Sequence, residues 1–304
     1  MGQAALITGS GALPAAVARA MDAPPLVCSL SGHTPEGIKP DLTFRLEHLG
    51  SLIETLKSRD VTEVCFCGAV TRPEIDPAAI DAATKPLIPA LQRALQPGDD
   101  GALRAIISVF EEAGFAVKGA HEIAPALLPP LGDLTRKTAD EGVRVESVTA
   151  RAVLQEMARI DEGQACVLRG ETVLAREDTR GTDAMLADLA APRAKPLPSA
   201  ADPFNWVMDS VAEALDDTAD WLAGAGGEKA ACKGAGGVLF KAPKPGQDRR
   251  ADLPTIGPET VRGAARAGLR GIVIEAGGVI VLDRDTVIRL CDEAGLFLSV
   301  RAVL

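Results

Sequence analysis

A dense group of charged and amide side chains follows the short apolar run Val238–Phe240 and offers the chemistry that phosphate groups require. All of these side chains belong to one loop, in which prolines at positions 243, 245 and 254 restrict the backbone. The group consists of Lys241, Lys244, Gln247, Asp248, Arg249, Arg250 and Asp252. Cations bind phosphate oxygens, and a carboxylate among them can hold a divalent metal or take a proton from water. The loop predicts phosphate chemistry, and a surface loop of mutually neutralising charges is the alternative.

Short strands and helices alternate along the chain and would position this loop. The apolar run Ala4–Thr8 ends in Gly9-Ser10-Gly11 and precedes a helical segment, which is the opening of a nucleotide-binding βα unit. Gly9, Ser10 and Gly11 would let backbone N–H groups approach a phosphate at the helix N-terminus. The full dinucleotide fingerprint needs a third glycine where the chain has Pro14, so a plain tight turn is an equal alternative.

Another apolar run, Val64–Val70, also breaks at a glycine and leads into Thr71 and Arg72. Ligands of open α/β sheets collect beyond the carboxyl ends of the strands. We therefore expect this second loop to share an edge with the first glycine loop and to contribute Gly68, Val70, Thr71 and Arg72. The arginine there has a reason to meet phosphate, although a surface arginine at a loop would look the same.

Six further polar residues at the ends of expected elements are ligand candidates. Two follow the strand Phe115–Lys118, three lie at the starts of helices, and one ends the strand that begins at Gly271. They are His121 and Glu122, then Asp100, Thr182 and Asp183, then Glu275. For the residues at helix starts the alternative is simple capping, and for the histidine it is a structural role.

The chain of 304 residues is long enough for two domains. A proline-rich stretch without periodicity places the hinge at 129–142. We expect an α/β protein with a Rossmann-like parallel sheet in an N-terminal domain, 1–135, and a smaller sheet in a C-terminal α/β domain, 143–304. The ligand cleft is expected between the domains.

Several helices and strands are expected outside these motifs. They are helices at Leu49–Lys57, Leu87–Leu95, Ala102–Glu112, Ala150–Ile160 and Pro258–Ala267, a hairpin of Gln164–Arg169 with Thr172–Glu177, and Val279–Leu282 paired with Gly271–Ile274. The segment 191–236 differs from the rest of the chain in composition, since it begins proline-rich and ends glycine-rich. It is interpreted as an insertion. It carries an amphipathic helix at Phe204–Ala223, whose acidic polar face disfavours insertion into an anionic bilayer.

Composition excludes several classes of function. The formal net charge of −10 argues against a general nucleic-acid binder. Six cysteines without a CxxC pair indicate core thiols in a reducing compartment. The N-terminus lacks a secretory pattern, and no apolar stretch approaches the ~18 residues of a membrane span.

Taken in order, seven motifs resemble those of the LpxI family, the UDP-2,3-diacylglucosamine pyrophosphatases of lipid A biosynthesis. The motifs are LITGSGALP, CGAVTRP, GDDGALR, GAHEI, GTDAML, VLFKAPKPGQDRRADLPTIGPET and IVIEAGG. They span nearly the whole chain, and the run K-x-x-K-P-x-Q-x-x-R-x-D-L-P-T-I-G is specific. The segment 191–236 is longer than the usual connection in the family.

The resemblance implies a magnesium-dependent hydrolase, cytoplasmic and peripheral to the inner membrane. Its products would be UMP and 2,3-diacylglucosamine 1-phosphate (lipid X), with water attacking the sugar-side phosphate and two domains enclosing the lipid product. The family's essential aspartate matches Asp252, and Asp248 ranks below Asp252 as a candidate for that role. Independently of the family, the residue types allow Lys241 and Arg250 to neutralise phosphate oxygens in catalysis, and Asp252 with Asp183 or Glu275 to hold Mg²⁺.

The expected substrate contacts combine both lines of argument. They are Gly9, Ser10, Gly11, Gly68, Val70, Thr71, Arg72, Asp100, His121, Glu122, Thr182, Lys244, Gln247, Thr255 and Glu275. UDP-2,3-diacylglucosamine and lipid X would be the ligands, the cytoplasmic membrane surface the source of lipid, and a homo-oligomer is compatible with the sequence. The alternatives are a Rossmann-type nucleotide-sugar oxidoreductase and a non-catalytic lipid or nucleotide binding protein.

Overall fold

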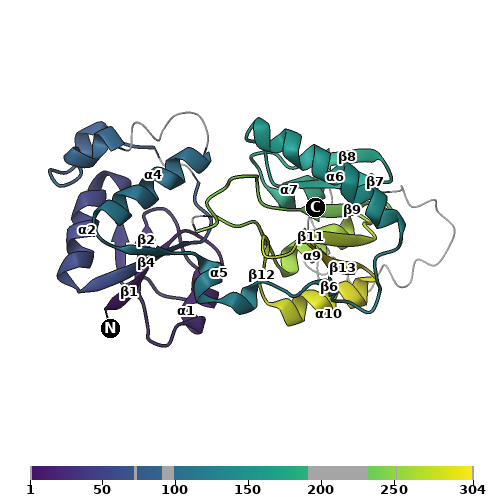
Figure 1. The fold of residues 1–304 in the computed structure, drawn as a ribbon, viewed down its shortest axis with the longest axis horizontal. Coiled ribbons are helices and arrows are strands. Elements are labelled where there is room, and N and C mark those ends of the chain that lie inside the picture. The colour runs from purple at the N-terminus through teal and green to yellow at the C-terminus, as the bar shows by residue number, and fades with distance from the viewer. Residues whose placement is uncertain (1, 72–73, 91–98, 191–231, 251, 303–304) are drawn as a thin grey trace, which may run out of the picture.

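The computed structural model of the chain describes residues 2–71, 74–90, 99–190, 232–250 and 252–302. Two α/β lobes lie next to each other along the long axis of the molecule (Figure 1). The N-terminal lobe contains a parallel sheet and the C-terminal lobe a mixed sheet. This confirms the expected fold class.

Five strands form the parallel sheet of the N-terminal lobe within the described residues, in the order β3-β2-β1-β4-β5. Their bounds are β1 Gln3–Thr8, β2 Leu26–Leu30, β3 Leu42–Phe44, β4 Val61–Cys67 and β5 Ala116–Lys118. The order is that of a Rossmann sheet, as expected. The strands are apolar because helices cover both faces. Strand β4 ends three residues earlier than expected, since Gly68 has a φ of +97° and turns the chain.

Four described helices belong to this lobe: α1 Leu13–Ala20, α2 Leu49–Ser58, α4 Asp99–Glu112 and α5 Ala120–Ile123. The apolar sides of α2 and α4 share one core with β1, β2 and β4, while α1 and α5 pack on the opposite face. The expected helix Leu87–Leu95 falls largely on residues 91–98, outside the described residues; Lys85–Leu87 forms a 3₁₀ turn.

Six strands form the main sheet of the C-terminal lobe within the described residues, in the order β6-β13-β11-β9-β7-β8. Their bounds are β6 Gly132–Asp133, β7 Ala165–Arg169, β8 Thr172–Arg176, β9 Val238–Lys241, β11 Gly271–Glu275 and β13 Phe297–Arg301. Strands β9, β11 and β13 are parallel, and the expected hairpin β7–β8 turns at Gly170, whose φ is +59°. The expectation that this lobe has the smaller sheet is wrong, because β6, β7 and β8 extend it antiparallel.

Helix α6, Gly142–Arg159, covers one face of this sheet, and α7 Thr182–Leu189, α9 Pro258–Arg266 and α10 Arg284–Ala294 cover the other. Helix α6 begins eight residues before the expected Ala150, because Val143 and Glu146 already continue its buried face. Pro258 occupies the first turn of α9, as expected, since a proline there loses no intrahelical hydrogen bond.

The short strand β12, Ile280–Val281, corrects one expected pairing. It pairs in parallel with β10, Thr255–Ile256, and not with Gly271–Ile274. The reason is that β11 already has β9 and β13 on its two edges and no free edge remains. The polar loop after β9 therefore ends in a small two-stranded sheet of its own.

The two lobes share an apolar core next to this small sheet. Leu253 and Ile280 from the C-terminal lobe are buried with Leu6, Val17 and Cys65 from the N-terminal lobe. The expected insertion lies mostly, and its helix Phe204–Ala223 entirely, outside the described residues. Among the described helices none is long and apolar enough to cross a membrane. All six cysteines are free thiols, and five are buried, in agreement with the expected core role.

Candidate active site

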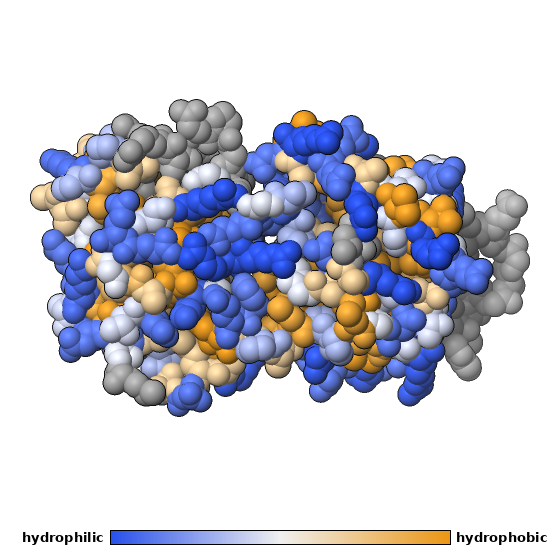
Figure 2. Space-filling model, in the orientation of Figure 1, coloured by the Kyte–Doolittle hydropathy of each residue, from blue (hydrophilic) through white to orange (hydrophobic). Residues whose placement is uncertain are grey.

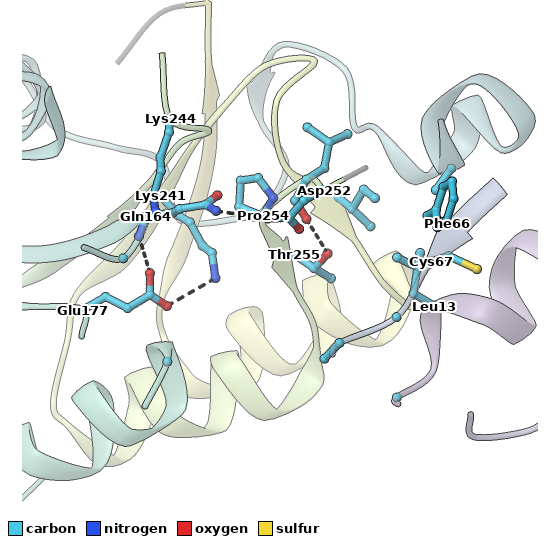
Figure 3. Close-up of a pocket in the computed structure, with 18 of the residues that line it drawn as sticks. Leu13, Phe66, Cys67, Gln164, Glu177, Lys241, Lys244, Asp252, Pro254 and Thr255 are labelled. Carbon is cyan, nitrogen blue, oxygen red and sulfur yellow. Dashed lines mark hydrogen bonds and ion pairs between the residues drawn. The ribbon is translucent and has the colours of Figure 1, made fainter. Parts of the chain in front are cut away.

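A cavity of about 500 Å³ lies between the two lobes. Figure 2 shows this face of the molecule hollowed where the lobes meet, with hydrophilic side chains around the hollow. One wall is apolar and comes from both lobes, and its members include Leu13, Phe66, Ala120, Leu253, Pro254, Ile280 and Leu282. The charged and amide side chains that line the cavity, here called the polar wall, come from the C-terminal lobe and include Gln164, Glu177, Lys241, Lys244, Arg249, Arg250 and Asp252. Figure 3 shows Phe66 and Leu13 across the cavity from Lys241 and Glu177.

Lys241 is the last residue of β9 and carries its ammonium group into a buried setting. Its Nζ donates a hydrogen bond of 2.7 Å to Thr182 Oγ1 and lies 3.9 Å from Glu177 Oε1. Burial lowers the pKa of Lys241, and the negative charges of Glu177, Asp183 and Asp252 oppose that effect. The strand thus delivers a cation whose charge depends on neighbouring carboxylates.

Asp252 is a partly buried carboxylate on the polar wall, held by two amide side chains. Its Oδ2 accepts hydrogen bonds from Gln247 Nε2 at 2.8 Å and from Gln164 Nε2 at 3.3 Å. Burial raises the pKa of Asp252, while the Gln164 hydrogen bond and the ammonium groups of Lys241 and Lys244 lower it. A carboxylate with a raised pKa is suited to accept a proton from water.

The loop between Lys241 and Asp252 is tied to both lobes. Lys244 Nζ donates to Asp161 Oδ1 at 2.6 Å within the C-terminal lobe. Arg250 donates to both oxygens of Asp248, at 3.0 and 2.7 Å, and to Glu111 Oε1 on α4 at 2.5 Å. Helix α4 belongs to the N-terminal lobe, and its Arg104 also donates to the carbonyl of Gly246. The cationic loop is therefore fixed in the same contacts that join the lobes.

The first glycine loop lies at the cavity, but much of its backbone is already hydrogen-bonded. Ser10 and Gly11 line the cavity, as does Gly68 of the second loop. The N–H of Gly9 donates to Cys67 O at 3.0 Å, and the N–H of Ser10 donates to Ala69 O at 2.8 Å. Two of the three amides expected to approach a phosphate therefore join the two loops to each other.

Thr182 and Gln247 do not line the main cavity but bond to residues that do, namely Lys241 and Asp252. Thr255, like Lys241, Lys244, Arg250 and Asp252, lines the cavity. Of the expected contacts, the cavity wall thus brings together Ser10, Gly11, Gly68, Lys241, Lys244, Arg250, Asp252 and Thr255.

Other expected site residues do not line the main cavity. Val70 is exposed, and Thr71 bonds through its N–H to His33 Nε2 at 3.0 Å. Glu122 caps its own helix α5, because its Oε2 accepts from the N–H of Gly119 at 2.6 Å. His121, on the same helix, has a buried Nδ1 without a hydrogen-bond partner among the described residues.

Glu275 and Asp183 also lie apart from this cavity. Glu275 borders a smaller neighbouring hollow and pairs with Arg249 at 3.7 Å. Asp183 is exposed in the first turn of α7. Asp100 lies in the first turn of α4, and Arg72 is outside the described residues.

Gln164 and Glu177 are among the polar residues of the wall that sequence reasoning missed. They stand where the hairpin strands β7 and β8 begin and end, and the Gln164 N–H donates to Glu177 Oε2. The available signal was their position: residues at the open end of a hairpin lie next to each other. The pairing of Glu177 with the buried Lys241, 64 positions away, could not be predicted from residue spacing.

The polar wall offers few ligands for a metal ion. The described residues contain no group of three or more His, Cys, Asp or Glu side chains arranged to hold one. Asp252 is nevertheless accompanied by Gln164, whose Oε1 is buried and accepts no hydrogen bond from the part of the chain that the structure describes. Magnesium is commonly held by one or two carboxylates together with substrate phosphates, and it prefers oxygen donors. The residues present fit that weak mode of binding.

Comparison with known proteins covers almost the whole chain. A family model described as the LpxI N-terminal domain matches residues 3–127, and the LpxI C-terminal domain matches residues 130–201 and 208–299. The chain is also similar to a UDP-2,3-diacylglucosamine pyrophosphatase LpxI of Caulobacter vibrioides. The two are 34% identical over 297 residues, which cover 96% of this chain and 95% of the relative.

Proposed function

Because this chain belongs to the LpxI family, we propose that it hydrolyses UDP-2,3-diacylglucosamine to UMP and 2,3-diacylglucosamine 1-phosphate (lipid X). The reaction would be a step of lipid A biosynthesis, and the enzyme a hydrolase acting on a diphosphate bond. The name of the Caulobacter relative supports the substrate.

The observation that carries the proposal is that several cationic side chains and several apolar side chains line one cavity. Lys241, Lys244 and Arg250 face the same space as Leu13 and Phe66. A pyrophosphate diester carries two negative charges, and an acylated sugar is apolar. A molecule that joins the two needs both kinds of side chain, and the cations offset the charge that repels a nucleophile.

The chemistry follows from these residues. Asp252 accepts a proton from a water molecule as the water oxygen forms a bond to the sugar-side phosphorus. The bond from that phosphorus to the bridging oxygen breaks, and UMP leaves with the bridging oxygen. Lys241 and Arg250 offset the negative charge that develops on the phosphate oxygens. The position of Asp252 on the cavity lining favours its role as the proton acceptor.

We further propose that the reaction depends on Mg²⁺, which Asp252 would hold as its protein ligand. The ion would supply positive charge to the phosphate oxygens. Asp183 is exposed and does not line the cavity, so we assign the metal to Asp252. Because substrate and product both carry acyl chains, we also propose that the enzyme meets them at the cytoplasmic face of the inner membrane.

An isotope experiment tests the reaction directly. The purified protein is incubated with UDP-2,3-diacylglucosamine in detergent micelles and H₂¹⁸O, with Mg²⁺ or with EDTA. We expect UMP and lipid X by mass spectrometry, with ¹⁸O in lipid X only. Label in UMP would contradict attack at the sugar-side phosphorus, and undiminished turnover in EDTA would contradict the metal dependence.

The variant Asp252→Asn tests the role of the carboxylate, because asparagine keeps the shape and can still accept from Gln247. We expect kcat to fall at least about a hundredfold, which corresponds to about 2.7 kcal/mol. Asp285→Asn is the matched control, since Asp285 is an exposed carboxylate of the same lobe outside the cavity. Tight lipid X binding by a wild-type protein without turnover would favour the binding-protein alternative, and nicotinamide absorbance after purification would favour the oxidoreductase.

A further inference from the structure

Glu177 is a buried carboxylate with an unusual set of partners. The described residues contain three buried glutamates: Glu47, Glu146 and Glu177. The first pairs with the guanidinium of Arg45 and the second with that of Arg270. Glu177 lines the cavity, and its cationic neighbour there is the ammonium group of Lys241 at 3.9 Å.

The sheet fixes the orientation of this carboxylate. Glu177 follows β8, and its own N–H donates to the carbonyl of Ala165 at 2.9 Å, which continues the hairpin ladder. Its Oε2 accepts the N–H of Gln164, so one oxygen is held by the neighbouring strand. Gly163 leaves the room for the side chain, because a Cβ at that position would lie 2.4 Å from Glu177 Cγ. The second oxygen, Oε1, is thereby directed toward Lys241 (Figure 3).

Thr182 completes a triangle with these two groups. Its hydroxyl accepts a hydrogen bond from Lys241 Nζ at 2.7 Å and donates its own proton to Glu177 Oε1. The ammonium group is therefore held on one side by a hydroxyl that is itself oriented by the carboxylate. The three residues come from β9, from the end of β8 and from the start of α7.

The negative charge of Glu177 offsets the burial of the Lys241 ammonium group. Taking an ammonium group out of water is unfavourable unless an opposite charge is near. Three carboxylates act on Lys241, from the end of β8, the start of α7 and the polar loop: Glu177, Asp183 and Asp252. Glu177 has the largest effect of the three.

We propose that Glu177 is a positioning residue for the hydrolysis: together with Thr182, it holds the ammonium group of Lys241 at the cavity wall, where the substrate phosphate arrives. This inference rests on the proposed function for its catalytic consequence. Its structural half, the fixation of Lys241 by Glu177, stands on the contacts alone.

The catalytic consequence is measured with Glu177→Gln. Glutamine keeps the size and can accept from the Gln164 N–H, but it lacks the charge. We expect kcat to fall about a hundredfold with KM changed less than about threefold, because the ammonium group acts mainly on charge that develops in the transition state. Glu146→Gln is the matched control, since Glu146 is a buried glutamate of the same lobe that pairs with Arg270 outside the cavity. We expect its kcat to remain within about threefold of wild type.

NMR can observe the ammonium group of Lys241 directly, independently of turnover. A buried, hydrogen-bonded NH₃⁺ group exchanges slowly with water, so its ¹H–¹⁵N NMR signal is observable. We expect such a signal in wild type and in Glu146→Gln, its absence in Lys241→Met, which assigns it, and its loss in Glu177→Gln. Thr182→Val removes the hydroxyl and should lose the signal as well, which keeps the test valid if the glutamine variant does not fold.

The two possible failures are distinguishable. A wild-type protein that shows the signal but releases no UMP would reject the proposed function and leave the fixation of Lys241 supported. Retention of the signal in Glu177→Gln and Thr182→Val, or a kcat of Glu177→Gln within threefold of the control, would overturn the positioning role.

Discussion

Replacing Ile280 by alanine should weaken the contact between the two lobes. Ile280 is 1% exposed and belongs to the apolar core that Leu253 shares with Leu6, Val17 and Cys65. The change removes three carbon groups, each worth about 0.8 kcal/mol on transfer from water, and so about 2.4 kcal/mol in all. The cavity left behind adds about 24 cal/mol per Å³, which brings the expected loss to about 3–4 kcal/mol.

Calorimetry separates this effect from a general loss of stability. Ile272→Ala is the matched control, because Ile272 is fully buried in β11 within the core of the C-terminal lobe alone. Both variants should lose similar free energy of unfolding. Only Ile280→Ala should split or broaden the unfolding transition, because it removes the apolar contacts that couple one lobe to the other.

The cavity provides a second readout, since Ile280 also forms part of its wall. We expect KM for UDP-2,3-diacylglucosamine to rise in Ile280→Ala and to stay near the wild-type value in Ile272→Ala. Two results would refute the reasoning: a loss of less than about 1 kcal/mol in Ile280→Ala, or a transition as sharp as that of the control.

Two more predictions concern the backbone of the glycine loop and the response to acid. Gly9→Ala should cost about 3 kcal/mol or more in urea unfolding, because its Cβ would lie 2.2 Å from the carbonyl oxygen of Ala69. Gly32→Ala, with a φ of +83° and open space around it, should cost only about 1–2 kcal/mol, and equal losses would contradict the steric argument. The pKa of Glu47 is lowered to about 2, chiefly by its hydrogen bond from Arg45, so its contribution to stability is present above pH 4.5 and is lost as the pH falls toward 2. Glu47→Gln should therefore be less stable than wild type at pH 6 and equally stable near pH 2; a constant difference between the urea midpoints would count against this assignment.

Local signals in the sequence determined much of the architecture. Apolar runs that end in glycine predict the buried parallel strands, and Gly170 and Pro258 mark the hairpin turn and the start of α9. The polar loop from Lys241 to Asp252 is also a local signal. Its residue types are dense, close in sequence and stiffened by prolines, so they are read without knowledge of the fold.

The tertiary structure alone decided which groups meet. Strand β12 pairs with β10 because β11 has no free edge, and no property of Ile280 or Val281 encodes that competition. Gly9 packs against the next loop through backbone contacts, and such contacts carry no side-chain signature.

The partners of the two central charges show the same limit. Thr182 is 59 positions from Lys241, and Gln164 is 88 positions from Asp252. Hydrophobic periodicity reports which face of an element is buried, over a few turns or residues. It carries no information on which distant polar group will share that burial, so the electrostatic environment of Lys241 and Asp252 arises only when the hairpin, α7 and the polar loop are brought together.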